Sequence, residues 1–166
     1  MKPENILLVS DDMENFDIKI ADLGFAQKFD KETGLDLVLG TPLYMAPELV
    51  QHQKYSEKVD VWSLGCITYQ LLTGKTPFDG KNIKKINQYI CQKDVSFSDK
   101  CWRNISDAAK DFIFQCLNKD QFQRASIHEL FDHPWICEVP EADSQDEEMQ
   151  LNIQTNLIQY QTCSEF

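Results

Sequence analysis

The sequence lacks the features that mark several classes of protein. None of its six cysteines forms a CxxC pair, and its three histidines do not have the spacing of metal ligands. It shows no signal peptide and no internal repeat. Together these absences favour a reduced, cytoplasmic protein over a secreted, disulfide-bonded one.

Basic residues are missing from the last part of the chain. Residues 125–166 carry nine acids and neither lysine nor arginine, whereas residues 1–124 carry 16 basic and 18 acidic side chains. Most of the net charge of −11 therefore lies in the tail, and the body is close to neutral. This balance argues against nucleic acid or an anionic membrane as the main partner.

The segment 56–74 is hydrophobic on nearly every face, which predicts a buried helix. Ser56 is the expected N-cap, and Gly74 suits the left-handed position after the last turn. Charged and polar residues at 57, 58, 60 and 70 argue against a membrane span. Asp60 lies one turn into this helix, so its carboxylate is expected either to cap local amides or to hold another segment.

A short β-hairpin is predicted near the start of the chain. An apolar run at 6–9 and an alternating run at 18–20 flank a polar loop. Such a hairpin brings Asn5 and Asp22 to the same end. An amide oxygen beside a carboxylate suits a Mg²⁺ ion that also holds phosphate.

Four motifs follow one another in a fixed order. They are KPEN at 2–5, DLG at 22–24, GTPLYMAPE at 40–48 and DVWSLG at 60–65. This series resembles the C-terminal lobe of a Ser/Thr protein kinase of the calcium/calmodulin-dependent type. The resemblance extends from Met1 to about Ile136 and implies a mainly α fold with a small β-hairpin. Within it, short helices are expected at 83–91, at 106–117 with one apolar face, and after a cap at Ser126.

The resemblance implies roles for residues around the motifs. Asp22 would bind the Mg²⁺ that bridges the phosphates of ATP, Asn5 the second Mg²⁺, and Lys2 the transferring phosphate. The Thr41 hydroxyl would help orient the catalytic loop. Glu4 would contact basic residues of a protein substrate.

Other roles implied by the resemblance are structural. Glu48 and Arg124 match a buried ion pair, for which a bidentate contact is well suited. Asp60 would bond backbone amides of the catalytic loop. Leu23 replaces the usual Phe of this motif, and Leu37 stands where a regulatory phosphothreonine often lies, so activation by phosphorylation there is not expected.

The chief departure from the family pattern is at Met1. The family places His-Arg-Asp, with its catalytic base, directly before this residue, and a glycine-rich loop, a lysine and a glutamate in an N-terminal lobe. None of these is in the sequence. We therefore expect an N-terminally truncated catalytic domain that is inactive alone. The alternative is a non-catalytic module that uses an exposed apolar face to dock a partner.

Residues 137–166 are predicted to form a separate acidic segment. After a linker, Ser144 and Glu147 form a capping box for a helix with Met149, Ile153 and Leu157 on one side. The segment resembles the regulatory junction of calcium-dependent kinases, which implies a calcium-binding regulatory domain as a partner. The sequence itself contains no EF-hand loop, and a packing helix or a disordered tail remain alternatives.

Overall fold

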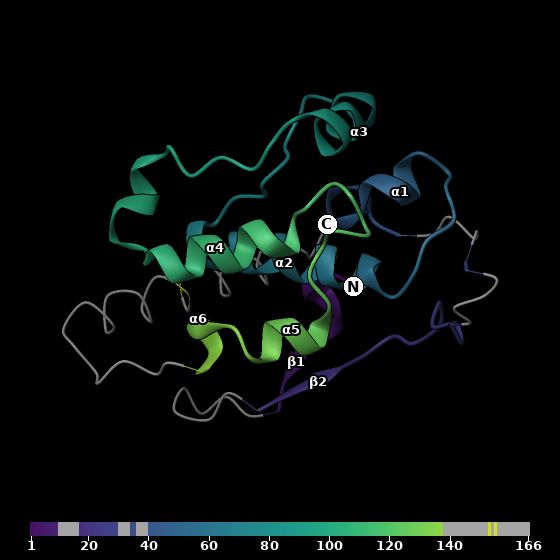
Figure 1. The fold of residues 1–166 in the computed structure, drawn as a ribbon, viewed down its shortest axis with the longest axis horizontal. Coiled ribbons are helices and arrows are strands. Elements are labelled where there is room, and N and C mark those ends of the chain that lie inside the picture. The colour runs from purple at the N-terminus through teal and green to yellow at the C-terminus, as the bar shows by residue number, and fades with distance from the viewer. Residues whose placement is uncertain (10–16, 30–33, 36–39, 138–152, 154, 156–166) are drawn as a thin grey trace.

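Helices dominate the computed structural model, which describes residues 1–9, 17–29, 34–35, 40–137, 153 and 155 (Figure 1). A single two-stranded antiparallel sheet accompanies them among these residues. The predicted class, mainly α with a small β-hairpin, is confirmed. The elements in chain order are η1 (Pro3–Asn5), β1 (Ile6–Leu8), β2 (Ile18–Ile20), η2 (Pro42–Tyr44), α1 (Pro47–Val50), α2 (Lys58–Thr73), α3 (Ile83–Gln92), η3 (Lys100–Asn104), α4 (Asp107–Cys116), α5 (Ile127–Phe131) and α6 (Pro134–Cys137).

Helix α2 forms the centre of the molecule. Trp62 and Cys66 on α2 are fully buried, and the helix packs against α4, whose apolar face is also buried. Gly65 makes this approach possible, because a Cβ atom there would lie 2.6 Å from the Cβ of Cys116. The buried helix predicted from the sequence is thus confirmed. No described helix is both long enough and apolar enough to cross a membrane.

The C-terminal end of α2 agrees with the sequence prediction, whereas its N-terminal end does not. Gly74 adopts the expected left-handed backbone, with φ of 70°. At the other end Ser56 is not the N-cap; that position belongs to Glu57, which already has helical backbone angles. The Ser56 hydroxyl accepts a hydrogen bond from the Lys58 amide at 3.3 Å, a local turn that replaces the cap.

The other helix starts follow their sequence signals. Ser106 accepts a hydrogen bond from the Ala109 amide at the start of α4, and Asn82 does the same for Lys85 at the start of α3. At α5, Ser126 and Glu129 form a reciprocal capping box. These contacts satisfy amides that would otherwise lack partners in the first turn.

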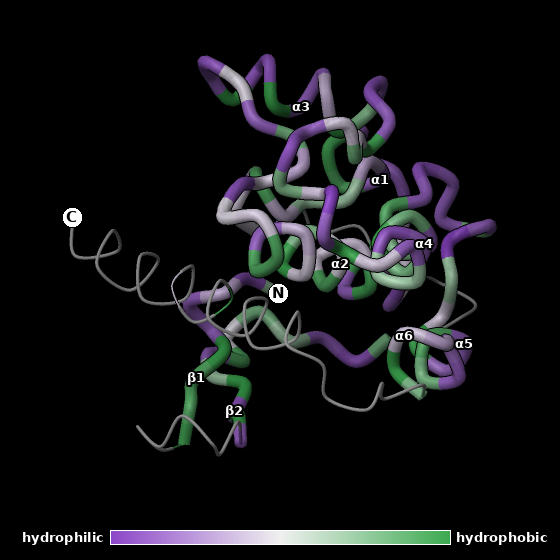
Figure 2. Tube along the Cα trace, turned by 90° about the vertical axis from the view of Figure 1, so that its left-hand side faces the viewer, coloured by the Kyte–Doolittle hydropathy of each residue, from purple (hydrophilic) through white to green (hydrophobic). Residues whose placement is uncertain are grey.

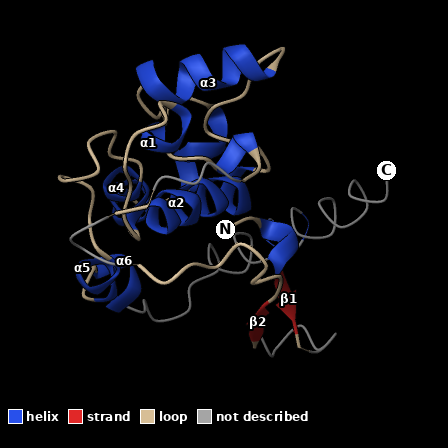
Figure 3. Cartoon of the chain, turned by 90° about the vertical axis from the view of Figure 1, so that its right-hand side faces the viewer, coloured by secondary structure: helices blue, strands red, loops and turns tan. Residues whose placement is uncertain are grey.

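The β-hairpin projects away from the helices (Figure 3). Its register pairs Ile6 with Ile20 and Leu8 with Ile18. A group of large apolar side chains on and next to the two strands is exposed, and we call it the hairpin face: Leu7, Leu8, Val9, Ile18, Ile20, Leu23 and Phe25. Figure 2 shows the two strands as a hydrophobic arm.

Most of the predicted tail lies outside the described residues, including the capping box at Ser144 and the positions Met149 and Leu157. Leu37 lies outside them too. Ile153 is described; it is helical, partly buried and packed against the main core.

Candidate functional site

Asn5 and Asp22 lie at the same end of the hairpin. Asn5 ends η1 directly before β1, and its carbonyl accepts a hydrogen bond of 2.7 Å from the amide of Ala21. Asp22 is the next residue, so the backbone pairing places Asn5 and Asp22 at the same end of the hairpin. The antiparallel register places them there because Ile6 pairs with Ile20.

The backbone at Asp22 is unusual for a residue that is not glycine. Its φ of 56° lies in the left-handed region, and its carboxylate accepts a hydrogen bond from the Gly24 amide at 3.3 Å. Aspartate tolerates this conformation better than most residues because of such local bonds. The conformation turns the chain sharply after β2, and the Asp22 side chain is exposed there.

These two residues fit a magnesium site of the kind that is completed by phosphate. Mg²⁺ is commonly held by one or two protein oxygens, with water and phosphate oxygens filling the other positions. The exposed Asp22 carboxylate and the half-buried Asn5 amide supply oxygens of that type. The described residues contain no group of three or more His, Cys, Asp or Glu that could hold a metal ion by itself. A Mg²⁺ site completed by phosphate and water oxygens does not need such a group.

The other predicted site residues are Lys2 and Glu4, which lie just before or within η1, and Thr41, which lies before η2. Lys2 precedes η1 and is half-buried, and its carbonyl accepts a hydrogen bond from the Asn5 amide. Glu4 is exposed within η1. Thr41 precedes η2, and its hydroxyl forms no hydrogen bond with the described residues. Its proposed role in orienting the catalytic loop stays a prediction.

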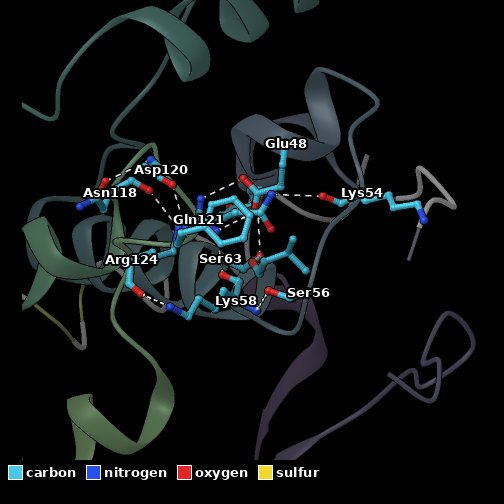
Figure 4. Close-up of polar contacts among 12 residues, drawn as sticks. Glu48, Lys54, Ser56, Lys58, Ser63, Asn118, Asp120, Gln121 and Arg124 are labelled. Carbon is cyan, nitrogen blue, oxygen red and sulfur yellow. Dashed lines mark hydrogen bonds and ion pairs between the residues drawn. The ribbon is translucent and has the colours of Figure 1, made fainter. Parts of the chain in front are cut away.

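Glu48 and Arg124 form a buried bidentate ion pair (Figure 4). The two guanidinium Nη atoms donate to the two carboxylate oxygens at 2.7 and 2.9 Å. Glu48 is 3% exposed and Arg124 is 1% exposed. The pair joins α1 to the loop between α4 and α5, residues 76 positions apart, as the sequence predicts.

Further hydrogen bonds complete the surroundings of Arg124. Its guanidinium also donates to the carbonyl of Asn118 at 3.0 Å and to that of Lys58 at 2.9 Å. Lys58 in turn donates to the Arg124 carbonyl at 2.6 Å. We call Glu48, Lys58, Asn118 and Arg124 the arginine tie. Lys58 and Asn118 were not foreseen, because backbone carbonyls leave no signal in a sequence.

Asp60 holds the start of the chain, but it is not a buried acid. Its side chain is 63% exposed, and it accepts a contact of 3.5 Å from the backbone nitrogen of Met1. The same nitrogen donates to the Ser63 hydroxyl at 3.4 Å. Of the two alternatives left open by the sequence, contact with another segment is the one observed. Although α2 is a largely buried helix, Asp60 itself lies at an exposed position on it.

Lys119 is a half-buried residue with an enclosed ammonium nitrogen, which sequence reasoning missed. Its ammonium lies 3.9 Å from the ring centre of Phe78 and 4.9 Å from that of Trp62, and its nitrogen has no hydrogen-bond partner within the described part of the chain. Burial lowers the pKa of Lys119 to about 8. By contrast, burial raises the pKa of the Cys116 thiol to about 12, and that of Cys66 also rises. Both thiols are therefore inert packing groups at neutral pH.

The sequence is similar to that of known proteins over most of its length. The model of the protein kinase domain matches residues 1–136. The chain belongs to the protein kinase family. The arginine tie, the hairpin and the helical body all lie within the matched region. The remaining residues, 137–166, lie beyond it.

Three relatives illustrate the similarity. Calcium-dependent protein kinase 5 of Plasmodium falciparum is 42% identical over 136 residues, 82% of this chain and 24% of the relative. Calcium/calmodulin-dependent protein kinase type I of Schizosaccharomyces pombe is 39% identical over 146 residues, 87% of this chain and 43% of the relative. Myosin light chain kinase 2 of Mus musculus is 37% identical over 141 residues, 85% of this chain and 23% of the relative.

These matches confirm the predicted resemblance to kinases of the calcium/calmodulin-dependent type. The chain spans less than half the length of each of the three relatives.

Proposed function

We propose that this chain supplies the magnesium- and phosphate-binding half of a kinase that transfers phosphate from ATP to Ser or Thr of proteins. The observation that carries the proposal is the meeting of Asn5 and Asp22 at one end of the hairpin, within a kinase-family match. When bound there, Mg²⁺ neutralises charge on the phosphates of ATP.

In this proposal each residue acts by holding or positioning. The Asp22 carboxylate and the Asn5 amide oxygen hold the two metal ions, and the Lys2 ammonium binds the transferring phosphate. Glu4, which is exposed, faces a basic residue of the substrate. The arginine tie keeps α1, which directly follows Thr41 and η2, fixed to the helical body.

We further propose that a polypeptide of these 166 residues alone does not transfer phosphate. The catalytic base, the glycine-rich loop and the strand lysine of the family are not among the residues. Without a group to accept the proton of the substrate hydroxyl, and with only half of the ATP site, positioning is incomplete.

The test has two arms. Determining the transcript upstream of Met1 shows whether the reading frame continues into His-Arg-Asp and an N-terminal lobe; the protein so encoded is then assayed for phosphate incorporation into Ser- and Thr-containing peptides. We expect Asp22→Asn to lower kcat by about 10²-fold or more, because a held metal ion is lost. Asp94→Asn, an exposed acid remote from the hairpin, is the control and leaves kcat unchanged.

The second arm uses the 166-residue polypeptide. We expect no incorporation above background. A measured turnover that Asp22→Ala abolishes would overturn the claim of inactivity. An encoded kinase whose turnover is indifferent to Asp22→Asn would overturn the assigned roles.

A second candidate function is a docking module, and the hairpin face favours it. Leu23 is 70% exposed and Phe25 68%, and five further apolar side chains lie nearby. Exposed apolar patches on the surface of a monomeric protein commonly mark binding sites for other molecules. Regulation by a calcium-binding partner acting on residues 137–166 is supported by the resemblance of this segment to a regulatory junction and by the relatives' names. A calcium-dependent change in turnover would test it.

A further inference from the structure

Helix α3 is the basic element of an acidic chain. Residues 81–93 contain four of the 16 basic residues, at positions 81, 84, 85 and 93, and no acid. The chain as a whole carries a net charge of −11. In Figure 2 much of α3 and the turn before it appears as hydrophilic tube at the outer edge of the molecule. Such a local reversal of sign is a candidate recognition surface.

A hollow lies at the start of this helix. It has a volume of about 650 Å³ and is lined by Lys81, Lys84, Lys85 and Tyr89 together with neighbouring polar groups. The volume lies within the range of about 300–1,000 Å³ that is usual for ligand-binding pockets. We call this feature the α3 hollow.

The positive charges around the α3 hollow are not neutralised. Within the described part of the chain, Lys81 and Lys84 form neither a hydrogen bond nor an ion pair. Lys85 donates to the Gln88 amide oxygen at 2.9 Å and lies 4.7 Å from the ring centre of Tyr89. Lys93 lies 4.2 Å from the same ring. Amide and ring contacts orient an ammonium group but leave its full charge in place.

One carboxylate also lines the α3 hollow. The side chain of Asp79 accepts a hydrogen bond from the Gly80 amide at 2.7 Å. It forms no ion pair with a lysine among the described residues. Three lysines against one such acid leave the hollow with an excess of positive charge.

We propose that the α3 hollow binds an acidic, Asp- and Glu-rich segment of a partner protein. The exposed ammonium groups of Lys81 and Lys84 are free to pair with carboxylates, and the open hollow admits an extended peptide. A long polyanion such as nucleic acid is disfavoured, because it would extend past the hollow over a chain of net charge −11. Binding here does not require phosphoryl transfer, so the inference stands or falls separately from the proposed function.

The test is fluorescence anisotropy on the complete 166-residue chain. The probe is a labelled peptide of alternating Glu and Ser, and the comparison peptide has Gln in place of every Glu. We expect the acidic peptide to bind at least about tenfold more tightly than the neutral one, and added salt to weaken it, because exposed charges are screened.

Two charge-matched double variants locate the site. Lys81→Glu with Lys84→Glu is expected to weaken binding by about tenfold or more, since both contacts become repulsive. Lys28→Glu with Lys100→Glu changes the net charge equally at exposed positions outside α3, and is expected to weaken binding by about twofold or less. Circular dichroism checks that both fold; if the first does not, the single variant Lys84→Gln replaces it, with a smaller expected loss.

Three results would overturn the proposal. The first is equal binding of the acidic and neutral peptides. The second is an equal loss in both double variants, which would mean that net charge alone governs binding. The third is a single-stranded oligonucleotide that displaces the acidic peptide and binds more tightly than it.

Discussion

The arginine tie and the hairpin differ in how they are held. Around Arg124, every charged or polar partner is buried or half-buried, and five hydrogen bonds join three segments of the chain. Around the hairpin, only Ile6 among the apolar residues of the two strands is half-buried against the core, the side chains of the hairpin face are exposed, and the strands are three residues long. The helical body therefore stabilises itself, whereas the hairpin carries the proposed chemistry with little tertiary support.

Removing Arg124 gives the largest expected effect. Arg124→Ala leaves the Glu48 carboxylate buried without a partner, and we expect a loss of about 3–5 kcal/mol in the free energy of unfolding. Urea unfolding followed by circular dichroism measures it. Lys110→Ala, which removes an exposed pair with Asp107, is the control and should cost less than about 1 kcal/mol. If Arg124→Ala and Lys110→Ala lower the free energy of unfolding by similar amounts, the arginine tie is no more important to stability than a surface ion pair.

A second comparison uses glycines in the two regions. In Gly65→Ala the new methyl group would overlap Cys116 between α2 and α4, and we expect a loss of about 1–3 kcal/mol. In Gly24→Ala it would lie 3.1 Å from a movable oxygen of Asp22, so the expected loss is about 0.5 kcal/mol. Thermal unfolding of both variants tests this; a more damaging change at Gly24 would show that the hairpin is the tighter region.

Lys119 links the stability of the helical body to pH. Its pKa falls from 10.5 to about 8, so between these values the folded chain has lost a proton that the unfolded chain keeps. Unfolding then takes up a proton, and this group's contribution to stability rises with pH across the window. Lys119→Met removes that rise. We expect the variant to be the more stable protein below pH 8, by a margin that shrinks as the pH rises toward 10.5.

The quantity to measure is the difference in the free energy of unfolding between Lys119→Met and the parent protein at each pH. The raised pKa values of Cys116 and Tyr69 give the opposite slope at high pH, but they do so in both proteins and cancel. The pKa of Cys66 is raised mainly by burial in both proteins, and the charge of Lys119 lowers it in the parent protein alone. Lys100→Met, at an exposed lysine, is the control. If the difference in stability between the two proteins does not change between pH 8 and 10.5, the folded chain does not release the Lys119 proton in that range, and the prediction is wrong.

The smallest effect is expected on the hairpin face. Ile18→Thr keeps a β-branched residue in β2 but removes exposed apolar surface, so the free energy of unfolding should change by about 0.5 kcal/mol or less. Binding of the dye ANS, which reports exposed apolar surface, should fall. Lys19→Thr on the same strand is the control and leaves dye binding unchanged. A large loss of stability in Ile18→Thr would place this side chain in a packed contact.

Much of the fold was predictable because its signals are local. Caps at Ser106 and Ser126, the left-handed Gly74 and the alternating hairpin each depend on a few neighbouring residues. Motif order indicated the Glu48–Arg124 pair, which the structure contains, and the placement of Asn5 and Asp22 at one end of the hairpin. The roles of the site residues stay predictions. The Thr41 hydroxyl, in contrast, has no partner among the described residues, since motif order does not fix where a hydroxyl points.

The sequence by itself determined the class of the fold, the position of the hairpin and the residues that meet at its end, because hydrophobic period and turn chemistry act over short distances. Only the tertiary structure decided the environment of each charge. It places two aromatic rings against the Lys119 ammonium, exposes Asp60, and gives the lysines of α3 no carboxylate partner within the described part of the chain. Those outcomes depend on which distant segments pack together, and the amino-acid sequence alone does not specify this.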